Sequence, residues 1–396
     1  MLEKLQKAPI DPILGLTELF QRDPNQQKIN LSVGVYKDNL NNTPIFNAVK
    51  KAERIILEKE KTKTYLPISG LPEFCEKTQR LVLGENCKIC EEERVGTVQT
   101  VGGTSALRIF ADFLRNNFGH KRIWIPDPTW ENHAKIFQMA GHEVTTYPYY
   151  DSLTQSLNWY SLKLTAEKIP SGDVMLLHGC CHNPTGLDLD KSQWEEISNI
   201  LNRKGILPLV DFAYQGLGDG LEEDAIGIRI MANNVPELFI CYSFSKNFGL
   251  YNERCGALLT IGENKEFVQK ALSQIKVVIR TNYSNPPSHG AQIINTILSD
   301  EVLKIEWLEE LNRMCQRIKD MRCLLVEKLK EKDLNKDFTH ILKQKGMFSY
   351  TGLSKEQVKR LREEFSIYIV ESGRINVAGI TTQNIDRLVD AIIKVI

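Results

Sequence analysis

The sequence lacks an excess of either charge, a long apolar run and an apolar start. Lys+Arg and Asp+Glu each total 50 among 396 residues. A nucleic-acid-binding protein usually carries a clear basic excess, so we expect no nucleic-acid partner. No apolar run approaches the roughly 18 residues of a membrane-spanning helix, and the first residues contain no apolar signal core. The composition therefore predicts a soluble, cytoplasmic protein without a membrane partner.

The cysteines follow no disulfide or metal-binding pattern. There are nine of them at irregular spacings, which in a long cytosolic chain indicates free thiols. Cys87 and Cys90 form a single C-x-x-C pair with no second pair, so zinc or redox chemistry is not expected there. Cys180 and Cys181 are adjacent, and in an extended chain their side chains would point in opposite directions. We therefore expect no metal site.

A dinucleotide fingerprint is also absent, because no G-x-G-x-x-G motif occurs, and this argues against a dehydrogenase. The chain instead alternates short apolar runs with longer helical patterns such as 193–204. Runs that are apolar on both faces and separated by helices predict an α/β fold with a mainly parallel sheet covered by helices. The predicted strands are 122–126, 173–178, 206–211 and 238–242.

The last third of the chain has a different pattern. Residues 301–332 have helical apolar spacing over a length that is typical of a helix joining two lobes. Short strands and helices are predicted after it, which indicates a smaller α+β domain. The predicted organisation is an N-terminal arm at 1–12, a small domain formed by 13–43 and 313–396, and a large domain at 44–312.

The loops that follow the predicted strands contain the candidate functional residues, because ligands in an open α/β sheet bind at the carboxyl ends of the strands. One loop, Gly102-Gly103-Thr104-Ser105, leads into an apolar helix at 107–114. Thr104 or Ser105 can serve as its N-cap, and the free N–H groups suit a phosphate. The alternative is an ordinary capped helix.

The other loops each allow two interpretations. Asp211 ends an apolar strand three residues before Tyr214, and a buried acid either needs a cationic partner or caps the next helix. Lys246 follows another strand, where it is either a surface cation or a Schiff-base amine. Asn183 lies in an Asn-Pro-Thr-Gly turn that leaves its side chain free at a strand end.

Taken together, these loops fit one ligand, pyridoxal phosphate. An acid beside the pyridine nitrogen keeps the ring protonated, which makes it an electron sink. The predicted contacts are Gly103, Thr104, Ser243, Ser245 and Arg254 for the phosphate, Lys246 for the aldehyde, Asp211 for the ring nitrogen, Tyr214 and Asn183 for the phenolic oxygen, and Trp130 for the ring face.

The motifs in these loops resemble those of the class I aspartate aminotransferases of the bacterial type, within the fold-type I pyridoxal-phosphate enzymes. The resemblance runs nearly end to end, beginning at Asp11. It rests on Leu31-Ser-Val-Gly-Val-Tyr-Lys37, Gly102-Gly-Thr104, His182-Asn-Pro-Thr-Gly186, Asp211-Phe-Ala-Tyr-Gln-Gly216, Ser243-Phe-Ser-Lys-Asn-Phe-Gly249, Tyr283-Ser-Asn-Pro-Pro287 and Ser372-Gly-Arg374.

The resemblance implies a role for each matching residue. Lys246 would hold the cofactor as a Schiff base and shuttle the proton, and the residues 44–312 would form the cofactor-binding domain. The implied catalytic residues are Lys246, Asp211, Tyr214 and Tyr65, with Tyr65 reaching a phosphate oxygen. The implied substrate-binding residues are Gly34 in a closing segment, Trp130, Asn183, Arg374 for the α-carboxylate and Arg280 for the distal carboxylate.

The resemblance also implies an assembly and the positions of two histidines. Tyr65 and Arg280 would come from the partner subunit, so the active sites of a homodimer would be shared. His133 would lie near Trp130, and His178 near Asp211. Without the resemblance, the simpler interpretation is that Arg280 is a surface arginine on a helix and that Arg374 pairs with a core acid.

The expected reaction is a ping-pong transfer of the amino group of L-aspartate to 2-oxoglutarate, giving oxaloacetate and L-glutamate. Pro67 and the segment Thr129-Trp-Glu-Asn-His133 resemble aromatic-preferring relatives, so an aromatic-amino-acid or dual-specificity aminotransferase is the alternative. Val35, Lys37, Thr104 and Asn285 resemble the aspartate type. A non-catalytic protein built on this fold would be expected to lack Lys246.

Overall fold

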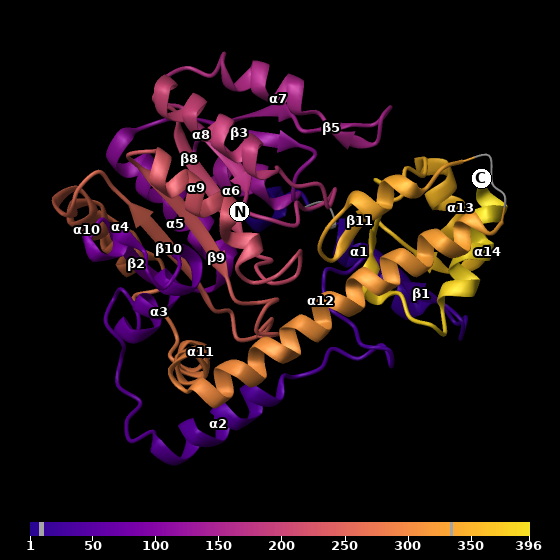
Figure 1. Cartoon of the computed structure of the whole chain (residues 1–396), viewed down its shortest axis with the longest axis horizontal. Coiled ribbons are helices and arrows are strands. Elements are labelled where there is room, and N and C mark those ends of the chain that lie inside the picture. The colour runs from indigo at the N-terminus through magenta and orange to yellow at the C-terminus, as the bar shows by residue number, and fades with distance from the viewer. Residues whose placement is uncertain (8–11, 333–335) are drawn as a thin grey trace.

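A seven-stranded sheet forms the centre of the larger of two lobes (Figure 1). The computed structural model describes residues 1–7, 12–332 and 336–396, without the side chains of 12–14. The predicted arm at 1–12 and the start of the resemblance at Asp11 therefore lie partly outside the described residues. The strand order is β2-β10-β9-β8-β7-β3-β4, with bounds β2 (Val95–Thr100), β3 (Arg122–Asp127), β4 (Glu143–Pro148), β7 (Val174–His178), β8 (Leu207–Phe212), β9 (Leu238–Ser243) and β10 (Gly256–Ile261).

The sheet is parallel except at one strand. The pairs β4–β3, β3–β7, β7–β8 and β8–β9 are parallel, whereas β10 is antiparallel to both β9 and β2. Strands such as β7, Val-Met-Leu-Leu-His, are buried along their whole length, as expected for a sheet covered on both faces. The predicted α/β fold with a mainly parallel sheet is confirmed.

Helices flank the sheet and their ends follow from local sequence. Helix α8 (Lys191–Lys204) begins at a capping box made by Asp190 and Gln193 and ends at Gly205, whose φ of 63° suits glycine. The other helices of this lobe are α2 (Asn47–Lys59), α3 (Pro72–Leu83), α4 (Lys88–Glu91), α5 (Gly102–Phe118), α6 (Asn132–Met139), α7 (Trp159–Ala166), η2 (Glu223–Ala225), α9 (Ile226–Asn234), α10 (Lys265–Asn282) and α11 (His289–Ser299), and β5 (Tyr150–Asp151) pairs with β6 (Ser156–Leu157).

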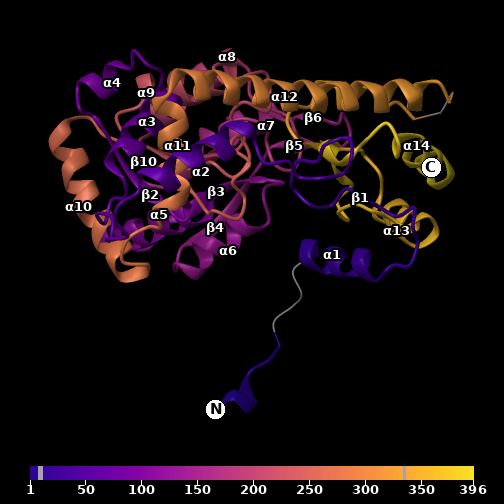
Figure 2. The same cartoon turned by 90° about the horizontal axis from the view of Figure 1, so that it is seen from below.

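Helix α12 (Glu301–Lys330) connects the two lobes as a long rod (Figures 1 and 2). It corresponds to the long helix that the sequence predicts at 301–332. Its buried face includes Trp307, Leu311 and Ile318, so the sequence spacing of three and four residues matches the buried stripe. Among the described residues, no helix combines the length and the apolar character needed to cross a membrane.

The smaller lobe joins segments from both ends of the sequence. Strand β1 (Ile29–Asn30) pairs in parallel with β12 (Ile367–Tyr368), and β11 (Phe348–Tyr350) pairs antiparallel with β13 (Arg374–Asn376). The helices of this lobe are α1 (Pro12–Arg22), η3 (Thr339–Lys343), α13 (Lys355–Phe365), η4 (Val377–Gly379) and α14 (Ile385–Val395), and η1 (Leu2–Lys4) lies away from the rest of the chain (Figure 2). This lobe places β13, and with it Arg374, against the carboxyl edge of the large sheet.

Candidate active site

A cavity of about 260 Å³ lies at the carboxyl edge of the parallel strands, between the two lobes. The large lobe supplies the ends of β8 and β9 and the start of α5, and the small lobe supplies Gly34 and the starts of β11 and β13. The lining residues are Gly34, Gly103, Thr104, Leu107, Trp130, His178, Asn183, Asp211, Ala213, Tyr214, Ser243, Ser245, Lys246, Arg254, Phe348 and Arg374. The structure thus gathers most of the predicted site residues around one space.

One end of the cavity is suited to an anion. Ser243 Oγ lies 3.2 Å from Ser245 Oγ, and Arg254 Nη1 donates to Ser245 Oγ at 3.3 Å. Gly102, with φ of 79°, lets the Arg254 guanidinium approach, because a Cβ there would lie 2.6 Å from Nη2. Hydroxyls, a guanidinium and the N–H groups at the start of α5 together form a phosphate-binding environment.

The predicted cap of this helix is wrong. Helix α5 begins at Gly102 and not at residue 107, and its N-cap, Val101, makes no side-chain cap hydrogen bond. Thr104 and Ser105 therefore lie inside the first turn. The positive φ of Gly102 allows the chain to enter the helix directly from β2, which leaves the first-turn N–H groups free of a side-chain cap.

Asp211 lines the cavity and lies at the end of a chain of hydrogen-bonded side chains. His133 Nε2 lies 2.9 Å from Asp211 Oδ2, and His133 Nδ1 lies 2.8 Å from Thr129 Oγ1. The same hydroxyl lies 2.9 Å from His178 Nε2, and the Asn183 N–H donates to His178 Nδ1 at 3.4 Å. As predicted, His178 lies opposite Asp211 on the neighbouring strand and His133 packs edge-on against Trp130. The direct hydrogen bond of His133 to Asp211 was not predicted.

With both imidazoles neutral, one set of donor directions satisfies every bond in this chain. The hydrogen bonds then run from the Asn183 N–H to His178, from His178 to Thr129, from Thr129 to His133, and from His133 Nε2–H to the Asp211 carboxylate. Burial lowers the pKa of His178 to about 3, so this ring is neutral at pH 7. Burial alone would raise the pKa of Asp211, but the His133 hydrogen bond and the charge of Lys246 act against it, and the pKa is lowered overall. Asp211 is therefore held as an anion.

Lys246 lines the same cavity as Asp211, and the pKa of its ammonium is lower than that of an ordinary lysine. Burial and the charge of Arg254 together lower its pKa to about 8, against the opposing charge of Asp211. Its Nζ lies 4.9 Å from the centre of the Tyr214 ring, and burial raises the pKa of the Tyr214 hydroxyl above its ordinary value. A lysine in this state supplies a neutral amine near physiological pH.

Arg374 approaches from the small lobe and binds across the lobe boundary. Its Nη2 donates to Ser32 O at 2.6 Å and its Nη1 to Asn183 Oδ1 at 3.3 Å. The guanidinium lies 4.3 Å from the centre of the Phe348 ring, and its Nε has no hydrogen-bond partner among the described residues. Burial lowers its pKa from the ordinary arginine value. No acid neutralises this guanidinium in the ion pairs of the described chain, so it can receive a carboxylate.

Two predicted residues lie outside the cavity. Tyr65 is 90% exposed, and Arg280 is exposed near the end of α10, where it bonds Ser284 one turn on. Neither lines the cavity in the part of the chain that the structure describes. Gly34 does line it, and a Cβ at Gly34 would lie 2.8 Å from Phe348 Cζ, so the absent side chain allows close packing.

Sequence reasoning assigned no role to Phe348, Leu107 and Thr129. Phe348 falls among the short strands and helices predicted after the long helix, and nothing in the sequence distinguishes an aromatic of the cavity wall from an ordinary core aromatic there. Thr129 belongs to the segment 129–133, whose resemblance concerns the whole segment. The contacts of its hydroxyl with His133 and His178 are visible only in the folded structure. These contacts depend on tertiary packing between distant segments.

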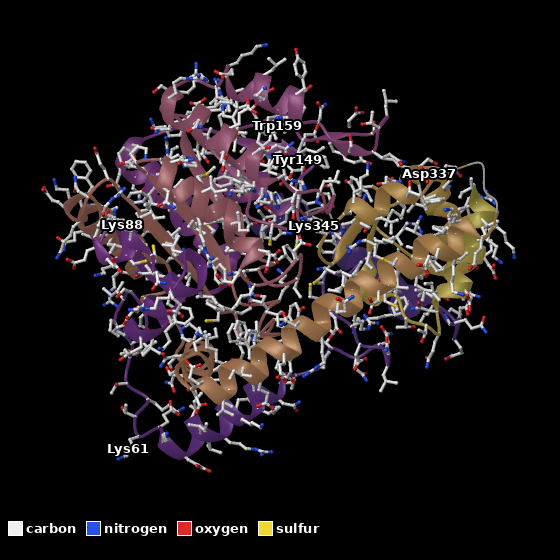
Figure 3. All side chains as sticks on the ribbon, viewed as in Figure 1. Lys61, Lys88, Tyr149, Trp159, Asp337 and Lys345 are labelled. Atoms are coloured by element: carbon white, nitrogen blue, oxygen red, sulfur yellow. The ribbon has the colours of Figure 1, made fainter. Side chains whose placement is uncertain are left out.

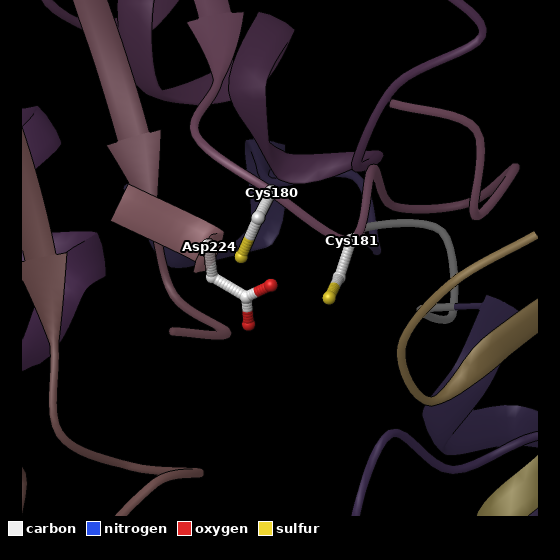
Figure 4. Close-up of side chains that lie close together, drawn as sticks. All are labelled: Cys180, Cys181 and Asp224. Atoms are coloured by element: carbon white, nitrogen blue, oxygen red, sulfur yellow. The ribbon is translucent and has the colours of Figure 1, made fainter. Parts of the chain in front are cut away.

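The adjacent cysteines also depart from the prediction. The side chains of Cys180 and Cys181 point toward the same space beside Asp224 (Figure 4). The expectation of opposite directions assumed an extended chain, but Cys181 has a left-handed φ of 50°. This turn reverses the usual alternation of side chains.

Comparison with known proteins agrees with this geometry. The family model "Aminotransferase class I and II" matches residues 26–392. The chain is 52% identical to the aspartate aminotransferase of Salmonella typhi over 100% of both chains. It is 45% identical to the aromatic-amino-acid aminotransferase of Pseudomonas aeruginosa over 99% of this chain and 98% of the relative.

Solved structures give the same result. The aromatic-amino-acid aminotransferase of Burkholderia pseudomallei, covalently bound to pyridoxal phosphate, matches with a TM-score of 0.97 and 44% identity, over 100% of this chain and 99% of that one. A family match over most of the chain, together with relatives at this identity, shows the family. This protein belongs to the class I and II aminotransferases.

Proposed function

We propose that this protein is a pyridoxal-phosphate-dependent aspartate aminotransferase, which transfers the amino group of L-aspartate to 2-oxoglutarate by a ping-pong mechanism. The single observation that carries the proposal is the cavity itself. It places the acidic ammonium of Lys246, the carboxylate of Asp211 and the guanidinium of Arg374 around one space. The relatives named aspartate aminotransferase support the choice of substrates.

The residues around the cavity fit pyridoxal phosphate group by group. Ser243, Ser245 and Arg254 gather at one end, where the phosphate would bind. Asp211 is held as an anion by the donor chain that ends at His133, which suits a protonated pyridine nitrogen. Gly103 and Thr104, at the start of α5, belong to the phosphate end, and Trp130, Asn183 and Tyr214 also line the cavity.

When bound, the cofactor supplies an electron sink beside the amino group of the substrate. Lys246 would hold the cofactor through its amine, and the freed amine would take the proton from the substrate Cα and return it to the cofactor carbon next to the substrate nitrogen. Its lowered pKa keeps enough of the amine neutral to accept that proton. Tyr214, with its pKa raised by burial, stays protonated and donates its O–H to the phenolic oxygen.

Arg374 and Asn183 are assigned to the α-carboxylate of the substrate. The guanidinium is buried against Phe348 and held by Ser32, so its fork is fixed before the carboxylate arrives. Gly34 and Phe348 both belong to the small lobe, and the absent side chain of Gly34 lets its backbone pack against Phe348 at the wall of the cavity. Fixed geometry of this kind orients the Cα–H bond toward Lys246.

The second carboxylate of aspartate is assigned to Arg280 of a partner subunit. Within one chain Arg280 is exposed and Tyr65 is almost fully exposed, so each is free to reach a neighbouring cavity. The apolar side chains of Leu2 and Leu5, at the exposed N-terminal end, support an arm that packs on the partner. The proposed assembly is a homodimer with two shared sites. A cytoplasmic location and the absence of nucleic-acid and membrane partners stay predictions from composition.

An aromatic-amino-acid aminotransferase is the second candidate. The observations that favour it are Pro67 beside Tyr65, the segment 129–133, and the 45% identity to the aromatic enzyme of Pseudomonas aeruginosa. The two functions share the catalytic residues, so kcat/KM on aspartate and on phenylalanine, measured with the same oxo acid, separates them. A higher value on phenylalanine would replace the aspartate assignment.

The deciding experiment follows the absorbance of the cofactor-loaded protein with excess aspartate and no oxo acid, beside a Lys246→Ala variant. The wild type should lose its long-wavelength band and gain the shorter-wavelength band of the aminated cofactor. The variant should bind cofactor without a covalent link and convert at least about 10⁴-fold more slowly. A wild-type protein that takes up no cofactor, or a variant that converts at the wild-type rate, contradicts the proposal.

A further inference from the structure

A second group of reactive side chains lies outside the cavity. The ligand atoms of Cys180, Cys181 and Asp224 all lie within 4.8 Å of one another, and all three residues are buried (Figure 4). We call these three residues the thiol cluster. None of the three lines the cavity, so the proposed transamination leaves them without a role.

The chain is bent into an uncommon conformation that brings the two thiols together. Cys181 is a non-glycine residue at φ of 50°, a region that costs free energy for most side chains. The Asp188 carboxylate holds this turn, because Oδ2 accepts the N–H of Cys181 at 2.7 Å and Oδ1 accepts that of His182 at 2.9 Å. A strained turn fixed by a buried acid points to a built site.

The carboxylate of the cluster is also fixed from behind. Asp224 accepts backbone N–H groups from Gly216 and Gly218 on Oδ2, at 2.8 and 2.9 Å, and from Asp219 on Oδ1, at 2.8 Å. A Cβ at Gly218 would lie 2.5 Å from Asp224 Oδ1 and 3.0 Å from Cys181 Sγ. The carboxylate and this sulfur therefore face each other across a residue without a side chain.

We propose that the thiol cluster is a binding site for a soft divalent cation, such as Zn²⁺ or Cd²⁺, and that an ion bound there inhibits the enzyme. Zinc binds a thiolate at roughly 2.3 Å and a carboxylate at roughly 2.0–2.2 Å, so ligand atoms on one ion lie on the order of 4 Å apart. Small side-chain rotations bring the cluster to that spacing. Each thiol releases its proton to solvent as its sulfur–metal bond forms, and water completes the coordination.

The cluster lies where the two lobes meet, which links the ion to activity. A Cβ at Gly346, in the segment before β11, would lie 2.4 Å from Cys181 Cβ, so this thiol packs directly on the small lobe. Cys181 is two residues from Asn183, which contacts Arg374 in the cavity. An ion that draws Cys181 toward Asp224 shifts this turn away from Gly346 and displaces Asn183. The inhibitory part of the inference rests on the proposed function, but metal binding does not.

An ion pair joins the two lobes next to the cluster. Lys345 Nζ lies 2.5 Å from Asp219 Oδ2, and both side chains are partly exposed. Lys345 lies between the two lobes in Figure 3, and Asp219 is bonded to Asp224 through its own N–H. A partly exposed pair is readily broken, so the ion enters when the lobes separate.

The chain provides its own control in a second thiol pair. Cys87 and Cys90 are partly buried at α4, and Lys88 between them lies far from Lys345 in Figure 3. Within the described residues, the thiol cluster is the group of at least three His, Cys, Asp or Glu side chains with metal-binding spacing, so the α4 pair lacks a third ligand. A two-ligand site binds the same ion more weakly.

The test titrates Cd²⁺ into the cofactor-loaded protein and follows cadmium–thiolate absorbance in the ultraviolet together with binding heat. The wild type and the double variant Cys87→Ser/Cys90→Ser should each bind one tight equivalent, while Cys181→Ser should bind at least about 100-fold more weakly, since it loses one thiolate. Tight binding that Cys181→Ser retains, or that the α4 double variant loses, overturns the site.

Two further measurements cover a poorly folding Cys181→Ser protein and the inhibition. X-ray absorption at the cadmium edge on the α4 double variant, whose cluster is unaltered, should report two sulfur ligands with oxygen. A shell without two sulfurs overturns the site. One equivalent of Cd²⁺ should lower kcat of that variant at least about tenfold and leave Cys181→Ser unaffected. Binding without inhibition overturns the inhibitory part alone, and because the metal measurements need no turnover, a failure of the proposed aminotransferase activity is seen separately.

Discussion

The two ends of the candidate active site differ in how fully one chain builds them. At the sheet end, Asp211 and Lys246 stand among buried partners from the same lobe, and a chain of donors through His133 fixes the charge of Asp211. By contrast, the two residues proposed to come from a partner subunit, Tyr65 and Arg280, lie outside the cavity and are exposed, and Arg280 bonds only its near neighbour Ser284 in the described chain.

The difference separates two tasks of the protein. The groups that act on the reacting atoms need lowered or raised pKa values, and only burial among fixed partners can provide these. The groups assigned to the distal carboxylate need only a guanidinium in the right place, and a second subunit can supply it. In the proposed function, one chain therefore carries the groups for the reaction chemistry, whereas a partner subunit would supply the group that binds the distal carboxylate.

The largest effect should follow from removing the charge at the sheet end. Asp211→Ala is expected to lower kcat about 10³-fold with aspartate and with phenylalanine alike, because the ring nitrogen loses its anionic partner. Steady-state rates on both substrates measure this. Asp211→Asn keeps the shape without the charge and should lose nearly as much, so an Asn variant within tenfold of the wild type would show that the charge is not what matters.

A smaller and more selective effect is expected at the exposed end. Arg280→Ala should lower kcat/KM about 10²-fold for aspartate, because the second carboxylate loses its partner, and should change the value for phenylalanine little. The assay compares the two amino acids. Equal losses on both would mean that Arg280 acts on folding or on the cofactor and does not read the distal carboxylate.

Mixed dimers test which subunit supplies Arg280 to each active site. Co-expressed Lys246→Ala and Arg280→Ala chains form one site with both substitutions and one with neither, provided that Arg280 comes from the partner. Aspartate activity of the purified mixed dimer should then approach half that of the wild type. If the mixed dimer is no more active than the better parent, Arg280 serves its own chain and the comparison between the two ends fails.

The lowered pKa of Lys246 should change the rate of cofactor attachment about tenfold between pH 7 and pH 9. Its neutral amine is the form that attaches the cofactor, and this form increases as pH rises through about 8. Covalent attachment to the apoprotein, trapped by borohydride and counted by mass spectrometry, should be about tenfold faster at pH 9 than at pH 7. An ordinary lysine would still be gaining rate above pH 10. Asp211→Asn should move the midpoint lower, since the Asp211 charge raises this pKa.

The smallest effect concerns Thr129, which joins two histidines in the donor chain. Thr129→Val removes the hydroxyl that contacts His133 and His178, and a lost hydrogen bond of about 1 kcal/mol corresponds to about a fivefold fall in kcat. The kcat of Thr129→Ser, which retains the hydroxyl, should stay near that of the wild type. If Ser and Val variants are equally slow, packing of the threonine methyl is responsible and the donor chain is not.

Much of the fold was predictable because its signals are local. Apolar runs bounded by Gly, Pro and Asn located β3, β7, β8 and β9 within about two residues, and the spacing in 301–332 predicted α12. The antiparallel direction of β10 could not be predicted, because an apolar strand reads the same in either direction and its neighbours are set by tertiary pairing.

The candidate site was predictable where one loop carries several informative residues. Lys246 with Ser243 and Ser245, and Asp211 with Tyr214, gave jointly specific patterns that the resemblance then extended to Arg374. The direct contact of His133 with Asp211 and the shared direction of Cys180 and Cys181 were missed. The first depends on the packing of α6 against the sheet, and the second on one left-handed residue, and neither feature leaves a local pattern.

The pairing of β1 with β12 has a consequence for how the protein is made. Ile29 lies opposite Ile367, so a segment that leaves the ribosome early has no partner until the chain is nearly complete. At about 5–20 residues per second, that interval is on the order of tens of seconds. The lobe that contains the large sheet can fold during translation, whereas Ile29 and Leu31 stay unburied and accessible to chaperones until the β12 segment has been made. Completion of the small lobe, and delivery of Arg374 to the cavity, is therefore a post-translational event.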